Sequence, residues 1–119
     1  MKQGKENFHE TLKLLLDQYA HSVYNASQKF PREEIFGITS QLKRAGISVV
    51  LNYLEGYARQ RPAVLKNFVE TSYGSLKEST YIIGFAQQRK WITKDVENDI
   101  LQQGDRIGKM LWGIIKKIE

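Results

Sequence analysis

Hydrophobic residues recur at intervals of three and four over most of the chain, as they do along one face of an α-helix. This spacing predicts four helices, over about residues 7–29, 32–59, 63–88 and 94–118. The predicted buried face comprises Phe8, Leu12, Leu15, Tyr19, Val23, Ala26 and Phe30 in the first helix, and Ile35, Ile38, Leu42, Ala45, Val49, Asn52 and Gly56 in the second.

Local signals mark where three of these helices begin. Pro31 and Pro62 suit a first helical turn, because proline lacks the N–H that a helix interior requires. Thr93 is a suitable N-cap, and Asp95 and Glu97 behind it favour the positive end of the helix dipole. The fourth helix is therefore predicted to start immediately after Thr93.

No segment alternates between polar and apolar residues with the period of a strand, so we predict an all-α protein. Short connections between long helices place successive helices side by side and antiparallel. The sequence thus predicts one domain over residues 1–119, an up-down-up-down antiparallel four-helix bundle. Gly104 and Gly108 fall on one face of the last helix, where they would let a neighbouring helix approach closely.

The second helix is apolar nearly all round, whereas each helix of a four-helix monomer keeps one face in solvent. We therefore expect another subunit to cover it, which predicts a homo-oligomer. The candidate interface residues are Ile47, Val50, Leu51 and Leu54.

The same helix carries a polar stripe at helical spacing, in which Glu55 and Arg59 are placed for an ion pair. Three interpretations are open: a structural network between helices or subunits, a surface that contacts a ligand or nucleic acid, and plain solvent exposure. The stripe comprises Gln41, Arg44, Ser48, Asn52, Glu55 and Arg59.

Composition narrows the function classes. The 119 residues include no cysteine, which excludes disulfides, thiol nucleophiles and cysteine metal sites. The net charge of +5 is compatible with a nucleic acid or an acidic partner. The apolar runs are too short for a signal peptide or a membrane span, so we expect a cytoplasmic protein with no membrane role. Candidate nucleic-acid-binding residues, at one end of the bundle, are Tyr57, Arg59, Arg61, Lys66, Lys116 and Lys117.

The sequence lacks the residue combinations that known types of catalytic site require. Glu6 and His9 form one Glu-x-x-His pair, but a di-iron bundle site needs two such pairs and further glutamates. The other histidine, His21, would point about 120° away from His9 on the helix. No nucleophile motif or phosphate-binding glycine loop is present. We expect no catalytic residue, metal, cofactor or small-molecule substrate, and hence no enzyme.

Several segments share a recognisable order and spacing: FPREEIFGITSQLKRA (residues 30–45), Ser48, NYLEG (52–56), Arg59, YGSLKE (73–78) and IGKMLWGIIK (107–116). Together they resemble the bacterial proteins encoded in 23S rRNA intervening sequences. The resemblance implies a four-helix bundle that assembles into a ring, a pentamer. It also implies a relationship to the accessory variability proteins of diversity-generating retroelements, which work with nucleic acid. No enzymatic activity is implied.

The leading hypothesis is thus a non-enzymatic, oligomeric bundle that binds structured RNA or DNA or a nucleoprotein partner. The alternative is a protein-interaction scaffold with no nucleic-acid role. The mild basic charge favours the first.

Overall fold

The computed structural model describes residues 2–119, and within that range it contains helices and no strands. This confirms the all-α prediction. The elements are α1 (Lys2–Ser27), the short 3-10 helix η1 (Arg32–Glu34), α2 (Ile38–Arg59), α3 (Pro62–Gln88) and α4 (Lys94–Ile118).

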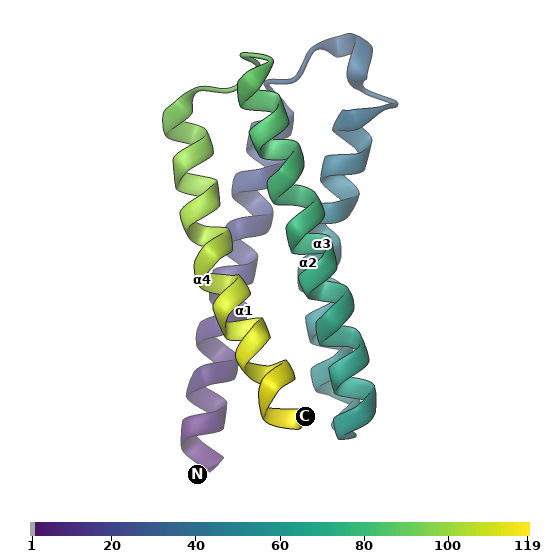
Figure 1. Ribbon diagram of the computed structural model, residues 1–119, viewed down its shortest axis with the longest axis vertical. Coiled ribbons are helices and arrows are strands. Elements are labelled where there is room, and N and C mark those ends of the chain that lie inside the picture. Colours follow the sequence, from purple (N-terminus) through teal and green to yellow (C-terminus); the bar gives the residue numbers. More distant parts are fainter. Residues whose placement is uncertain (1) are drawn as a thin grey trace.

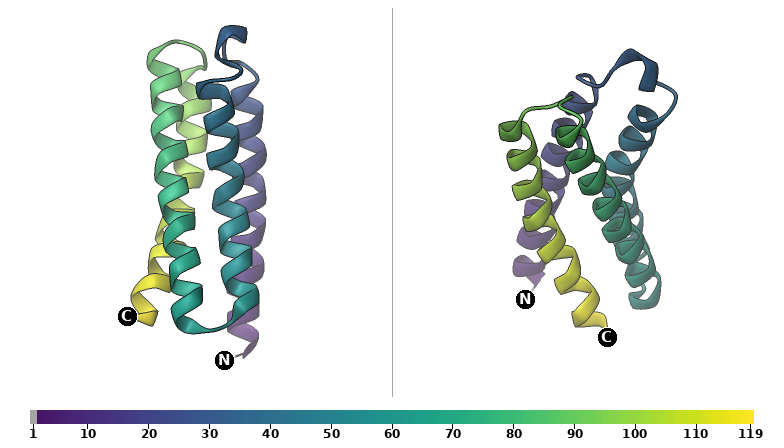
Figure 2. Two further views of the ribbon diagram at one scale, coloured as in Figure 1. Left: turned by 90° about the vertical axis from the view of Figure 1, so that its right-hand side faces the viewer. Right: turned by 45° about the horizontal axis from the view of Figure 1, so that its top comes forward.

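Successive long helices run in opposite directions (Figure 1). The two chain ends and the α2–α3 connection lie at one end of the bundle, and the other two connections lie at the opposite end (Figure 1). Helix α2 packs against α1 and α3, and α4 packs against α3 and α1. The turned views in Figure 2 show the helices side by side along a molecule of 47 × 25 × 20 Å. The up-down-up-down four-helix bundle is confirmed.

The core follows the predicted helix faces with two shifts on α1. Leu12, Tyr19 and Val23 are fully buried as predicted, but Leu16 is buried in place of Leu15, and Phe8 is exposed. The cluster also contains Leu42, Val49 and Tyr53 of α2, Val69, Leu76, Ile82, Ile83 and Ala86 of α3, and Ile100, Ile107, Leu111 and Ile115 of α4.

The predicted start of the second helix at residue 32 is wrong, since α2 begins at Ile38. Pro31 opens a turn held by i→i+3 hydrogen bonds, in which the Ile35 N–H donates to the Arg32 carbonyl at 3.1 Å. Gly37, a poor helix former, follows with non-helical backbone angles (φ −111°, ψ −114°). This turn carries the chain across from α1 to α2, so Ile35 is 51% exposed instead of facing the core.

The other boundaries shift less. Helix α1 begins at Lys2 and ends at Ser27, where residues 7–29 were predicted, and α3 and α4 match within one residue. Thr93 caps α4 as predicted, because its hydroxyl accepts the Val96 N–H at 3.2 Å. The capping side chain satisfies one N–H that the first helical turn leaves unpaired.

Glycines bring neighbouring helices into close contact at several places, among them Gly56, where a Cβ atom would lie 2.8 Å from Cβ of Phe68. A Cβ atom placed on Gly46 would lie 2.8 Å from Cγ1 of Val23, and one on Gly104 would lie 3.0 Å from Cγ2 of Thr80. Real side chains do not tolerate the first distance, so α1 and α2 approach as they do because residue 46 has no side chain. The prediction of close helix approach is confirmed at Gly104.

Buried hydroxyl groups join the helices across the core. The hydroxyl of Tyr19 lies 2.6 Å from Oγ of Ser79, and Ser72 donates to the carbonyl of Val49 at 2.6 Å. Burial raises the pKa of Tyr19 to about 12, so its hydroxyl stays neutral. These bonds satisfy polar atoms that burial would otherwise destabilise.

Candidate functional site

The basic residues singled out in the sequence gather at the end of the bundle that holds the chain termini. Arg59 is the last residue of α2, and Gln60 then adopts a left-handed conformation (φ 65°) that ends the helix. Arg61 is the N-cap residue of α3, and Lys66 lies one turn into that helix. Lys116 and Lys117 occupy the last turn of α4, which closes the same end of the bundle (Figure 1).

Several of these charges are neutralised within the subunit. Nε of Arg59 donates to the Glu55 carboxylate at 2.8 Å, which confirms the predicted ion pair. Nζ of Lys66 and Nζ of Lys116 each lie 3.3 Å from the Glu119 carboxylate. Hydrogen bonds from Lys116 and Lys66 lower the pKa of Glu119, so it stays ionised. Three of the candidate cations therefore already have an acidic partner.

Two candidate cations are free to meet an external anion. Arg61 and Lys117 are exposed, and neither forms an ion pair with any of residues 2–119. They project from the α3 N-terminus and the α4 C-terminus respectively. The free positive charge of this end is thus smaller than its count of basic residues.

Tyr57, proposed from sequence to stack on a base, already stacks within the subunit. Its ring lies parallel to the His9 ring at 3.5 Å between centroids, with an interplanar angle of 7°. Nδ1 of His9 lies 2.8 Å from the Tyr53 hydroxyl, so the three side chains form a cluster between α1 and α2. Burial lowers the pKa of His9 and raises that of Tyr53. One face of Tyr57 is therefore occupied.

The polar stripe of α2 faces α3 over part of its length. Oγ of Ser48 lies 2.8 Å from Oγ of Ser75, and the Asn52 amide donates to the Ser48 hydroxyl at 2.8 Å. Gln41 and Arg44 line a shallow polar hollow of about 290 Å³ between the same two helices. Ser48 thus bonds across to α3, and Asn52 bonds back to Ser48 within α2. Gln41 and Arg44 are exposed, and Gln41 donates to the Glu78 carboxylate of α3 at 3.5 Å.

The opposite flank of α2 presents apolar residues outward. Ile47 is 48% exposed and Leu51 is 56% exposed. Val50 and Leu54 are only partly buried and also pack against the subunit's own core. The four candidate interface residues therefore form a continuous strip, in which Ile47 and Leu51 are about half exposed.

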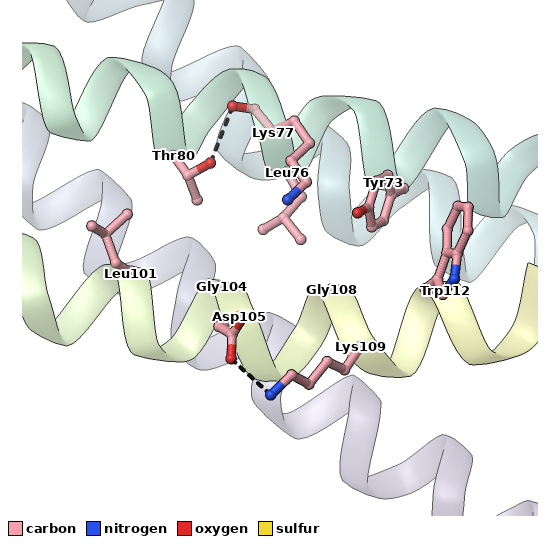
Figure 3. Close-up of a pocket in the computed structure, with 10 residues that line it drawn as sticks. All are labelled: Tyr73, Leu76, Lys77, Thr80, Leu101, Gly104, Asp105, Gly108, Lys109 and Trp112. Carbon is pink, nitrogen blue, oxygen red and sulfur yellow. Dashed lines mark hydrogen bonds and ion pairs between the residues drawn. The ribbon is translucent and has the colours of Figure 1, made fainter.

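A groove between α3 and α4 was not predicted as a site. It has a volume of about 340 Å³, and Leu76, Leu101, Tyr73 and Trp112 provide its apolar lining. Figure 3 shows Lys77 extending from α3 over the space between the helices, and Lys109 and Asp105 pairing along α4 at 3.1 Å. The remaining lining residues are Thr80, Gly104 and Gly108.

A sequence signal for this groove existed. Gly104, Gly108 and Trp112 are spaced by four, so they follow one another along one face of α4. Gly104 and Gly108 let α4 approach α3 closely, and the exposed Trp112 one turn further on marks where the groove opens.

The described residues hold no group of three or more histidine, aspartate and glutamate side chains placed to bind a metal. His21 lies 3.6 Å from Asp17, and both side chains are largely exposed. Among residues 2–119, no helix contains a stretch apolar enough to span a bilayer.

Four antiparallel helices with short connections define the molecule as a small up-down helical bundle. The chain belongs to the family of 23S rRNA-intervening sequence proteins, whose model matches residues 16–113. This confirms the resemblance carried by the segments between residues 30 and 116.

A solved structure shares this fold. It is a protein of unknown function from the S23 ribosomal protein family of Bacteroides thetaiotaomicron, with 23% sequence identity and a TM-score of 0.83. The match covers 92% of this chain and 98% of that one, so the two share the whole bundle. No curated protein matches the chain. Neither the family nor this neighbour belongs to a known class of enzyme.

Proposed function

We propose that this protein is a non-enzymatic homo-oligomer, a pentameric ring, that binds the phosphate backbone of structured RNA or DNA. The observation that carries the proposal is the end of the bundle where Arg61 and Lys117 stand exposed without an acidic partner among residues 2–119. A ring repeats this pair in every subunit, so that weak single contacts add through avidity.

The exposed strip of α2 supports the oligomer. A strip that includes Ile47 and Leu51 gains free energy when a second subunit removes it from water. At +5 per chain, five copies would carry +25, which favours a polyanion as the partner. We expect neither a cofactor nor a small-molecule substrate, and we place the protein in the cytoplasm.

The oligomer is tested by light scattering at micromolar concentration. Val50 and Leu54 contact the subunit's own core, so a charge there would also disturb the fold. Leu51→Asp is the cleaner variant, because Leu51 is more than half exposed in the single chain. We expect it to dissociate the ring with its helix content unchanged, and Leu14→Asp, at an exposed position on α1, serves as the control. A mass of 13.8 kDa for the unmodified protein would contradict the oligomer.

Nucleic-acid binding is tested with an RNA hairpin and a DNA duplex at about 50 and 200 mM salt, because phosphate contacts weaken steeply as salt rises. Arg61→Ala combined with Lys117→Ala should lower the affinity and reduce the salt slope. Arg59 is a poorer choice, since it pairs with Glu55. Arg89→Ala, at the opposite end of the bundle, is the matched control (Figure 1).

The second candidate function is a protein-interaction scaffold, which the internal ion pairs and the exposed apolar side chains favour. Lys66 and Lys116 are already paired with Glu119, while several large hydrophobic side chains are exposed. An intact oligomer that binds no nucleic acid at the lower salt concentration would support a protein-interaction scaffold instead.

A further inference from the structure

The turn between α1 and α2 presents a large apolar side chain to solvent. Phe36 is 96% exposed, and its neighbour Ile35 is 51% exposed. Hydrogen bonds of 2.9 to 3.1 Å within the turn, including Gly37 N–H to the Glu34 carbonyl, hold this segment in place. We call Ile35 and Phe36 the apolar tip. An ordered segment that exposes two adjacent apolar side chains is a candidate surface for contact with a partner.

The groove between α3 and α4 is large enough to receive such an apolar side chain. Its volume of about 340 Å³ exceeds the roughly 150 Å³ in which an apolar cavity accommodates benzene. Tyr73 and Trp112 stand at one end of it, and their rings lie 5.7 Å apart (Figure 3). An aromatic side chain entering here would meet Leu76 and Leu101 on the groove walls.

The charges around the two surfaces are complementary. Glu33 and Glu34 precede the apolar tip, and with Arg32 they give it a net charge of −1. Lys77 and Lys109 border the groove, and with Asp105 they give it a net charge of +1. Lys77 has no acidic partner among residues 2–119, and its ammonium group lies 5.2 Å from the centre of the Tyr73 ring.

The two surfaces cannot meet within one chain. The tip lies at the α1–α2 end of the bundle, whereas the groove runs along the outer face of α3 and α4 (Figures 1 and 3). A contact between different surfaces of identical subunits is head-to-tail, and it closes into a ring when the rotation between neighbours permits.

We propose that the apolar tip of each subunit inserts into the α3–α4 groove of the next copy of this chain. The inference rests on the proposed homo-oligomer and specifies which surfaces join its subunits. Phe36 fills the groove, and Glu33 and Glu34 meet Lys77 on its border.

The first test replaces the tip. Phe36 is almost fully exposed in the single chain, so Phe36→Ser leaves the fold of the subunit intact. Loss of a buried phenylalanine contact should weaken subunit association about 10- to 100-fold, measured as the shift in the concentration at which light scattering reports dissociation. Leu14→Ser removes an exposed apolar side chain outside both surfaces and is the matched control. An unchanged association constant for Phe36→Ser would overturn the inference and leave the oligomer itself standing.

The second test reverses the charges. Glu33→Lys and Lys77→Glu should each weaken association, and the two together should restore it, because the pair is remade with opposite polarity. Restoration in the double variant identifies the contact itself. Additive weakening in the double variant would contradict it.

The third test uses the absence of cysteine from the natural chain. Arg32→Cys combined with Asp105→Cys keeps Phe36 in place and, treated with a short bis-maleimide, should give a ladder of covalent dimers, trimers and larger species. Either cysteine alone should give no ladder. Covalent dimers from Arg32→Cys alone would indicate a symmetric tip-to-tip contact and overturn the head-to-tail arrangement. A parent protein of 13.8 kDa in solution would overturn both this contact and the proposed ring.

Discussion

Replacing Gly46 by alanine tests the packing of α1 on α2. The added methyl group would lie 2.8 Å from Cγ1 and 3.4 Å from Cβ of Val23. Val23 is buried and β-branched, so its side chain has little freedom to move aside, and the helices must separate. Overpacking of this kind destabilises by about 1–3 kcal/mol, whereas removing a glycine from a helix interior stabilises by about 0.5–1 kcal/mol. We expect a net loss of about 1 kcal/mol.

Gly74→Ala is the matched control for this variant. Gly74 also lies inside a helix, but a Cβ atom there would meet nothing within 4 Å. The same substitution should therefore stabilise the protein by about 0.5–1 kcal/mol. Because the helix contribution is common to both, the gap between the two variants measures the contact with Val23, about 1–3 kcal/mol.

The assay is urea unfolding followed by circular dichroism at one fixed protein concentration, since any oligomer makes stability depend on concentration. Opposite signs for the two variants are expected. Equal stabilisation by both alanines would refute the argument that the missing side chain at Gly46 sets the distance between α1 and α2.

Three further outcomes can be checked in the same assay. Thr93→Ala should reduce the free energy of unfolding by about 0.5–2 kcal/mol, because α4 loses its capping hydroxyl. Tyr19→Phe should reduce it by about 0.5–1.5 kcal/mol through loss of the 2.6 Å bond to Ser79, and an unchanged midpoint would contradict the bond. Burial lowers the pKa of His9 below its ordinary value of 6.5. Between these two pKa values the unfolded chain binds more protons than the folded one. The free energy of unfolding should therefore fall as the pH falls through that range. His9→Gln should remove this part of the pH dependence, whereas His21→Gln, at an exposed position, should leave it in place.

Helix existence, helix order and most of the core could be predicted because each depends on local periodicity. Leu42, Val49 and Gly56 fall every seven residues along α2 and all face inward. The failure at residues 32–37 has a different cause. The sequence of the turn is compatible with a helix that starts after Pro31, but i→i+3 bonds hold residues 31–35 and Gly37 departs from helical backbone angles. The glycine was a local signal, yet other glycines of this chain lie inside its helices, so Gly37 alone did not mark the boundary.

The position of the basic end of the bundle could be predicted from the sequence, but the internal ion pairs that reduce its free charge could not. That Arg59, Lys66 and Lys116 would share one end follows from antiparallel helices alone. That Lys66 and Lys116 share the Glu119 carboxylate depends on how α3 and α4 meet there, at 3.3 Å from each ammonium group. The stacking of Tyr57 on His9 likewise needs the packing of α1 on α2, which brings together residues far apart in the chain.

The distribution of polarity around α2 supports the proposed homo-oligomer. Its flank toward α3 carries hydrogen-bonded polar groups, including Ser48 and Asn52, where a monomeric bundle would place apolar residues. Its outward flank carries Ile47 and Leu51, where a monomer would place charges. The outward flank leaves apolar area in water, which costs free energy in an isolated subunit, whereas the hydrogen-bonded Ser48 and Asn52 carry no such cost. A second copy that covered the outward flank would remove this cost. If the proposed contact between the apolar tip and the α3–α4 groove forms, it would join two unlike surfaces, so the assembly that covers α2 would be head to tail.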